Sequence, residues 1–538
     1  MTPRTAKRPP QERRAAGLAG TGVLLRLALR RDRVMMPVWI LAATLLVAGM
    51  PGSLGSVYAT TAERAEVAAS MNANGSMRAL YGPVFGDSLG GLTAWRAGVF
   101  GAVLAAVMSL IIVVRHTREE EEETGRQELL SAAMVGRRAP LTAALLAALV
   151  ANTCLALLVT GGLAEQGAPG AAALGLALAG TGMLFAGTAA VAAQLTESAR
   201  AAKGLTAAVL GAAFVLKAAG DAGTADGRSA LTWLSPLGWV ENVRAFAAER
   251  WWVLLLLAAA ALAQIGAGYL LAGRRDLGMS FLPSRPGPAD GRMGSAGALA
   301  WRLQRGTLAG WSAAFLTAGA VFGGMADGAA DLVGGNDRTR EIIERMGGQG
   351  GLTDAFLATM AGMFGTVAAL YAVSAVLRLS GEESAQRAEP LLAHAVGRLR
   401  WAGGHLAVAF GGSALILLLA GLGLGIGHGG DVGTAVAATL AQLPAVWVIG
   451  ALAALLHGTL PAYAAAAWAV AGGALALGWV GPALDLPQGV LDLSPFAHLP
   501  RLPGAESLSW APLLALTALA AALTAAGLTA LRRRDITA

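Results

Sequence analysis

The chain has 538 residues, of which 55% are hydrophobic and 14% are charged, and its formal net charge at pH 7 is +7. A soluble globular protein carries about a quarter charged residues, and one hydrophobic core does not grow to this size. The composition therefore excludes an ordinary soluble domain and indicates a protein that is solvated by lipid.

Twelve apolar runs are long enough to cross a bilayer, which takes about 20 helical residues. The first six lie at roughly 36–58, 97–114, 141–163, 168–194, 201–219 and 251–272. The second six lie at roughly 306–325, 355–377, 402–427, 432–457, 460–480 and 510–531. The sequence therefore predicts an all-α integral membrane protein of about twelve transmembrane helices, located in the plasma membrane.

The excess positive charge lies in the N-terminal arm. Nine Lys and Arg precede the first apolar run, against only Glu12 and Asp32, and this difference accounts for the whole net charge. With the N-terminus inside, the cytoplasmic segments contain 29 of the 40 Lys and Arg. This positive-inside bias predicts that both termini are cytoplasmic. A basic arm on a membrane protein indicates contact with anionic lipids, so we expect membrane lipids and no nucleic acid as partners.

The two halves of the chain repeat in register. Arg126 matches Arg387, and Glu128 matches Glu389 at the same separation along the chain. Near the end of the first half, Arg274-Arg275-Asp276 matches Arg533-Arg534-Asp535. A nearly constant offset at these positions predicts two tandem six-helix repeats of the same orientation. The expected domains are a basic cytoplasmic arm with an amphipathic interfacial helix at 1–35, a first permease repeat at 36–278, a cytoplasmic linker at 279–304 and a second repeat at 305–538.

A charged loop follows the second apolar run of each half. The first charged loop (115–130) contains five consecutive glutamates and ends in Glu-Leu-Leu, and the second charged loop (378–392) repeats its acids and leucines. Most charge runs are solvated flanks. Here the acids oppose the positive bias of the cytoplasmic face and recur in both halves, which favours docking to a basic groove on a soluble partner.

The helix expected before the first span places Arg26, Arg30 and Arg33 on one face, with Val23, Leu24 and Leu27 displaced from them. This spacing is typical of an interfacial anchor. Inside the spans, Asn152, Gln264 and Gln442 are the candidates for a substrate pathway, although polar residues there more often hold helices together.

Several chemistries lack their motifs. The three lysines, Lys7, Lys203 and Lys217, do not fit a phosphate-binding loop, and no metal-ligand pattern stands out. We expect no catalytic residue, no metal and no bound cofactor in this chain. No acidic residue lies in the middle of a predicted span, which counts against ion-coupled transport.

The loop pattern Glu-Glu-x-x-Gly-Arg-x-Glu-Leu-Leu followed by Val-Gly-Arg resembles the first cytoplasmic loop of type-2 ABC exporter permeases. The duplicated form, with Arg-Arg-Asp ending each half, is similar to actinobacterial exporters of tetronasin and polyketide antibiotics. The resemblance implies a fused dimer of six-span permease domains, served by two copies of a separate ATPase subunit that binds ATP and Mg²⁺. It also implies a pathway between the halves, lined mainly by the second and fifth spans.

The resemblance assigns contact with the ATPase to residues of both charged loops. They are Glu121, Glu122, Gly125, Arg126 and Glu128 in the first loop and Glu382, Glu383, Arg387 and Glu389 in the second. The second loop departs from the pattern, because Ala385 or Gln386 stands near the expected glycine and Pro390 follows the glutamate.

The favoured hypothesis is the membrane subunit of an ATP-driven exporter that moves an amphipathic small molecule, such as an antibiotic or drug, out of the cytoplasm. One alternative is an ion-coupled secondary multidrug transporter, which is also often built from two six-span halves. A second alternative is a membrane protein without transport activity.

Overall fold

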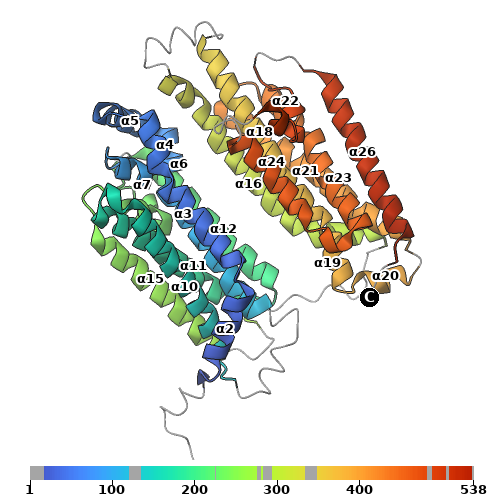
Figure 1. The fold of residues 1–538 in the computed structure, drawn as a ribbon, viewed down its shortest axis with the longest axis horizontal. Coiled ribbons are helices and arrows are strands. Elements are labelled where there is room, and N and C mark those ends of the chain that lie inside the picture. Colours follow the sequence, from blue (N-terminus) through green and yellow to red (C-terminus); the bar gives the residue numbers. More distant parts are fainter. Residues whose placement is uncertain are drawn as a thin grey trace, which may run out of the picture. The chain divides into compact units, whose positions relative to one another are not determined.

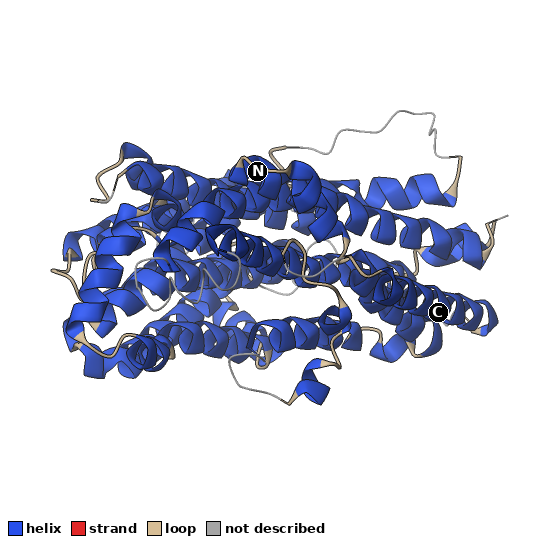
Figure 2. Cartoon of the chain, turned by 90° about the horizontal axis from the view of Figure 1, so that it is seen from above, coloured by secondary structure: helices blue, strands red, loops and turns tan. Residues whose placement is uncertain are grey.

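The computed structural model describes residues 17–119, 135–224, 226–274, 280–282, 294–333, 348–394, 396–480, 487–504 and 508–535. Across these ranges the chain is helical and contains no β-strand (Figure 2). The chain divides into two compact units, Met1–Pro286 and Gly287–Ala538. The expectation of an all-α integral membrane protein is confirmed.

Unit 1 begins with a helix that precedes the first apolar segment and with two helices that form this segment. It ends with the long helix α15 (Trp251–Arg274) (Figure 1). Its elements are α2 (Thr21–Arg31), α3 (Met35–Ala48), α4 (Met50–Val57), α5 (Thr61–Ala73), α6 (Gly75–Tyr81), α7 (Leu89–Val114), a π-helical turn (Arg115–Glu119), α10 (Ala139–Leu163), α11 (Ala168–Leu195), α12 (Ala199–Gly223), α13 (Ala230–Leu234), α14 (Pro236–Asn242) and α15 (Trp251–Arg274).

Unit 2 repeats the succession of long helices, with a short helical pair after its second long helix. Its elements are α16 (Ala296–Val333), α18 (Gly348–Val376), α19 (Arg378–Ser384), α20 (Ala388–Leu392), α21 (Arg398–His428), α22 (Val432–Leu440), α23 (Leu443–Thr459), α24 (Ala466–Val480), α25 (Gln488–Leu491) and α26 (Trp510–Arg533).

Eleven segments of the described residues are long and apolar enough to cross a membrane, six in unit 1 and five in unit 2. The run predicted at 460–480 contains α24, whose apolar stretch Ala466–Leu475 is shorter than a span. Pro461 opens a separate 3₁₀ turn (Pro461–Tyr463), so the long helix does not begin at the start of that run. The number twelve and the cytoplasmic position of the termini remain predictions.

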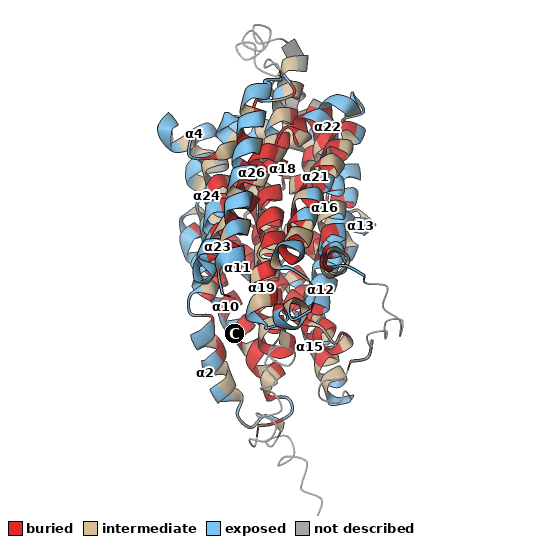
Figure 3. Ribbon diagram, turned by 90° about the vertical axis from the view of Figure 1, so that its right-hand side faces the viewer, coloured by how far each residue is buried: buried red, intermediate tan, exposed pale blue. Residues whose placement is uncertain are grey.

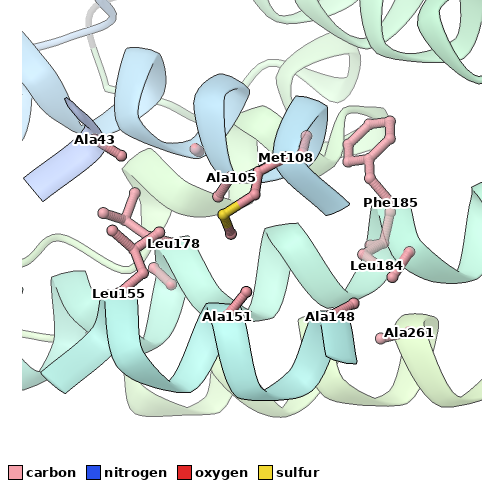
Figure 4. Close-up of a cluster of buried hydrophobic side chains, with 14 of the residues drawn as sticks. Ala43, Ala105, Met108, Ala148, Ala151, Leu155, Leu178, Leu184, Phe185 and Ala261 are labelled. Carbon is pink, nitrogen blue, oxygen red and sulfur yellow. The ribbon is translucent and has the colours of Figure 1, made fainter. Parts of the chain in front are cut away.

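The core of unit 1 combines many alanines with larger apolar side chains. Ala105 and Met108 of α7 lie among Ala148, Ala151 and Leu155 of α10 and Leu178, Leu184 and Phe185 of α11 (Figure 4). Large apolar side chains such as Leu157 and Leu255 are instead exposed on the outer surface. Figure 3 shows this division, with buried residues on the inner faces of the helices and exposed residues outside. Such a surface fits lipid and not water.

In unit 2, α16 and α21 meet through paired glycines four residues apart. A methyl group on Gly319 would lie 2.4 Å from the Ala420 carbonyl oxygen, and one on Gly423 would lie 2.3 Å from the Leu316 carbonyl oxygen. Gly323 and Gly427 continue the same contact one turn further along. Small residues at this spacing let two membrane helices approach until their backbones touch.

We predict that Gly423→Ala lowers the free energy of unfolding by about 1–3 kcal/mol, because its new methyl group overpacks against backbone that has no room to move. Thermal unfolding of the purified chain in detergent measures the effect. The matched control is Gly411→Ala on the same helix, where an added methyl group meets nothing within 4 Å. Equal losses in the two variants would contradict the glycine contact.

Candidate functional site

The second charged loop is a short helical hairpin that directly continues a long apolar helix. After α18 the chain forms α19, turns at Gln386, whose φ of 55° is left-handed, and forms α20 (Figure 1). The Arg387 backbone N–H donates to the Glu382 carbonyl oxygen at 2.9 Å and closes this turn. The hairpin is therefore an ordered extension of α18.

Glu382, at the end of α19, points into the hairpin. Its carboxylate lies 2.7 Å from the Arg378 guanidinium, one turn earlier, and 3.6 Å from that of Arg387. The side chain of Glu382 is 9% exposed. Two arginines thus hold this carboxylate inside the loop.

Glu383 joins the hairpin to the ends of two other helices. Its Oε2 lies 2.8 Å from the Arg534 guanidinium, just after α26, and 3.5 Å from His457 Nε2 of α23. The other ring nitrogen of His457 lies 2.8 Å from Ser380 Oγ of α19. These contacts join α19 to α23 and to the residue that follows α26.

An apolar contact supports these ion pairs. Leu379 of α19 and Ala388 of α20 are buried against Trp401 and Ala402 of α21 and Leu531 of α26. Arg398 at the start of α21 donates to the carbonyl oxygens of Arg532 and Arg534. The second charged loop is thus clamped to α21, α23 and α26 by both polar and apolar contacts.

Glu389 differs from the two glutamates before it. It lies in the first turn of α20 with its side chain exposed, next to the exposed Pro390. Of the three glutamates expected to contact a partner, Glu382 and Glu383 bind within unit 2, and only Glu389 is presented at the surface. Arg387 is exposed as well, while its guanidinium faces Glu382.

Glu121, Glu122, Gly125, Arg126 and Glu128 of the first charged loop lie outside the described residues. The residues just before them are firmly held. The fully buried Asp32 lies 2.8 Å from Arg115 and 2.7 Å from His116 Nε2, both in the π-helical turn. Arg118, also buried, donates to the carbonyl oxygens of Ala193 and Thr196 at the end of α11.

The segment after the first charged loop is attached to the start of the chain. The backbone N–H groups of Gly136 and Arg138 donate to the carbonyl oxygens of Ala19 and Gly17, at 2.9 and 3.0 Å. Together with the Asp32 ion pairs, these bonds join the N-terminal segment to the start of the first charged loop and to the segment that follows it. Sequence reasoning counted Asp32 as part of the charged arm and did not single it out.

On α2, Arg26 and Arg30 are exposed, and Arg33 is exposed just beyond the helix. Val23 and Leu27 share their exposed side, whereas the sequence analysis placed them on a different face. The face buried by α2 is that of Ala28, with Leu24 half-buried. An exposed face that carries arginines and apolar side chains together suits the headgroup region of a bilayer, where long cations reach out to the phosphates.

The three polar residues proposed for a pathway lie at helix contacts within single units. Asn152 Nδ2 donates to Ser109 Oγ of α7 at 2.8 Å, and its carboxamide lies against Gly182 of α11. Gln264 accepts a hydrogen bond from Thr188 Oγ1 at 2.6 Å, and the buried Gln442 packs on Gly365. Each has the geometry of a residue that holds helices together.

Sequence reasoning also missed ionisable residues inside the helices. His457 lies in the candidate span Val432–Thr459, and Lys217 and Asp221 are buried in the candidate span Ala199–Gly223. The apolar run predicted for this helix ends at residue 219. Because α12 extends to Gly223, Asp221 lies in the last turn of this helix, beyond the end of the predicted span.

Long apolar helices, a lipid-compatible surface and two helical units define a multi-pass integral membrane protein. Residues 293–532 match the family model described as "Multidrug efflux system permease Rv1217c, C-terminal domain". The chain is 45% identical over 535 residues to the "Multidrug efflux system permease protein Rv1217c" of Mycobacterium tuberculosis (strain ATCC 25618 / H37Rv), covering 97% of this chain and 96% of the relative. The chain therefore belongs to this family of multidrug efflux permeases.

We predict that Glu383→Gln loosens the second charged loop, because the exchange removes the carboxylate that joins α19 to Arg534 and His457. Amide hydrogen exchange of the purified chain should be about 10-fold faster in α19 and α20. This change corresponds to a loss of roughly 1.4 kcal/mol in the free energy of local opening. Glu389→Gln is the control, since Glu389 is exposed, and should leave the exchange unchanged. Similar exchange rates in the two variants would show that the ion pairs do not hold the loop.

Proposed function

We propose that this chain is the membrane-spanning permease subunit of an ABC exporter, which moves an amphipathic compound out of the cytoplasm. A separate ATPase subunit, present in two copies, binds ATP and Mg²⁺ and supplies the energy, and this chain has no catalytic residue of its own. A relative named as the permease of an efflux system supports the division into a permease and other components. The compound is a drug or antibiotic, by analogy with that name.

The observation that carries the proposal is the clamped hairpin of the second charged loop. A partner that pushed on α19 and α20 would act on α18 through continuous helix, on α23 through Glu383 and His457, and on α26 through Arg534. Several long helices would move together. This is what a loop must do if it converts the motion of a soluble subunit into motion of membrane helices.

The geometry refines which residues meet the ATPase. Glu382 and Glu383 position the hairpin, because their carboxylates are already paired inside unit 2. Glu389 and the turn before α20 form the exposed part, so they are the contact surface we assign to the partner. By the internal repeat, Glu128 takes the place of Glu389 in the first charged loop.

Affinity purification of the chain from its native membrane in mild detergent, followed by mass spectrometry, tests the proposal. A soluble ATPase with a phosphate-binding loop should copurify at two copies per chain. Its absence under conditions that preserve known ABC complexes would overturn the proposal.

We predict that the double variant Glu128→Arg/Glu389→Arg loses the ATPase in this purification while it still inserts into the membrane, because reversed charge repels a basic groove. The matched control is Glu66→Arg, an exposed glutamate on α5, at the end of unit 1 opposite α2. Export and complex assembly at the level of the unmodified chain in the double variant would refute the assignment of these two residues.

The buried Lys217 and Asp221 of α12 favour one alternative, an ion-coupled secondary transporter. The two mechanisms differ in their inhibitors. Export driven by the ATPase is stopped by vanadate and survives a protonophore for as long as ATP is maintained, whereas ion-coupled export responds in the opposite way.

A further inference from the structure

Three ionisable side chains of unit 1 are buried together at the end that carries α6 and α14. Lys217 and Asp221 lie one turn apart on α12 and have no exposed side-chain surface, and the side chain of Glu241 on α14 is 7% exposed. Lys217 Nζ lies 2.7 Å from Glu241 Oε1 and 3.4 Å from Asp221 Oδ2. We call these three residues the buried triad.

The backbone and neighbouring side chains close around the triad. Lys217 Nζ also lies 3.3 Å from the Leu80 carbonyl oxygen, and Thr232 Oγ1 of α13 donates to Asp221 Oδ1 at 2.7 Å. Gly82 has a left-handed φ of 86° and lies so close to Glu241 that an added methyl group would be 2.3 Å from Oε1. The triad thus joins α12 to α6, α13 and α14.

No other charged side chain of the packed elements balances the triad, within the part of unit 1 that the structure describes. Arg78 of α6 directs its guanidinium to the carbonyl oxygens of Asp221 and Ala222, and Arg96 of α7 lies 4.1 Å above the Tyr81 ring. Arg244, which follows α14, lies 4.1 Å above the Phe85 ring. α11 has no charged residue, and α15 has only Arg274, its last residue.

The triad therefore combines one cation with two carboxyl groups, and its polar atoms are not all satisfied. Apart from the ion pairs with Lys217, neither oxygen of Glu241 nor Asp221 Oδ2 accepts a hydrogen bond from the described residues. A buried net charge is unfavourable, and a second carboxylate at the same site disfavours the ionised form of the first. Burial raises the pKa of Glu241 well above its usual value, with Lys217 opposing this effect and Asp221 adding to it.

We propose that Asp221 and Glu241 hold one proton between them at neutral pH, so that the buried triad is a neutral proton-binding site that fastens α14 to α12. The proton supplies a donor for oxygens of Asp221 and Glu241 that receive none apart from Lys217, and the remaining carboxylate balances Lys217. The proton belongs to the pair of carboxyl groups and not to either one alone. This proposal does not depend on how transport is energised.

The proton links the closure of the triad to pH. Glu241 binds the proton more tightly in the closed triad than it would in water, where its pKa returns to the ordinary value. The stabilisation is therefore complete below the ordinary pKa of a carboxyl group and is lost as the pH rises through the raised pKa. Movement of α14 away from α12 releases the proton.

Infrared spectroscopy of the purified full-length chain in lipid nanodiscs tests the proposal. At neutral pH the unmodified chain should show the carbonyl stretch of a protonated carboxylic acid, shifted in D₂O. Glu241→Gln and Asp221→Asn should each abolish that band, because each leaves a single carboxylate to balance Lys217. Glu66→Gln, on the exposed side of α5, should keep it.

Two results would overturn the proposal. The absence of the band from the unmodified chain at neutral pH would mean that both carboxyl groups are ionised, and this measurement needs no variant to fold. A band of undiminished intensity in both Glu241→Gln and Asp221→Asn would place the proton elsewhere in the protein.

Thermal unfolding provides an independent reading. The melting temperature of the unmodified chain should fall from mildly acidic to mildly alkaline pH, and Glu241→Gln should show a smaller fall, because an amide imitates the protonated group. The double variant Asp221→Asn/Glu241→Gln leaves Lys217 buried without a counter-ion and should melt lower than either single variant at neutral pH. The same pH dependence in Glu241→Gln and the unmodified chain would contradict the proposal.

Discussion

Close contact between helix backbones is the interaction on which the rest of this structure depends. Lipid tails are as apolar as leucine, so burying apolar side chains gives little drive for one membrane helix to associate with another. Helices must gain from tight packing instead, and this requires small residues at the contact. Gly319, Gly323, Gly423 and Gly427 supply it between α16 and α21, and alanines supply it in the core of unit 1.

Tightly packed helices leave little room for charged side chains between them. The charged side chains instead form pairs and clusters near the ends of helices. Asp32 binds Arg115 and His116 at one end of unit 1, and the buried triad lies at the other end. In unit 2, Glu383 binds Arg534 and His457. A charge withdrawn from water is tolerated only when it is paired, so each cluster also fixes how the chain segments that supply it are joined.

The charged loops illustrate how far the sequence could be interpreted. Their acids, their recurrence in both halves and their position after the second long helix were visible in the order of residues. Whether a given glutamate faces outward was not, since Glu382, Glu383 and Glu389 are of one type within one short segment. Arg534 lies 151 residues beyond Glu383, and only folding brings the two side chains together.

The sequence by itself determined the class of fold and the approximate positions of the long helices, and it predicted two repeats, because hydropathy and an internal offset can be read from the order of residues. Asn152 and Gln264 were recognised as polar residues inside spans for the same reason. Tertiary structure alone decided what those residues touch, how far α12 extends and that Lys217, Asp221 and Glu241 share a site. These features depend on burial and on contacts between distant segments, which residue order does not encode position by position.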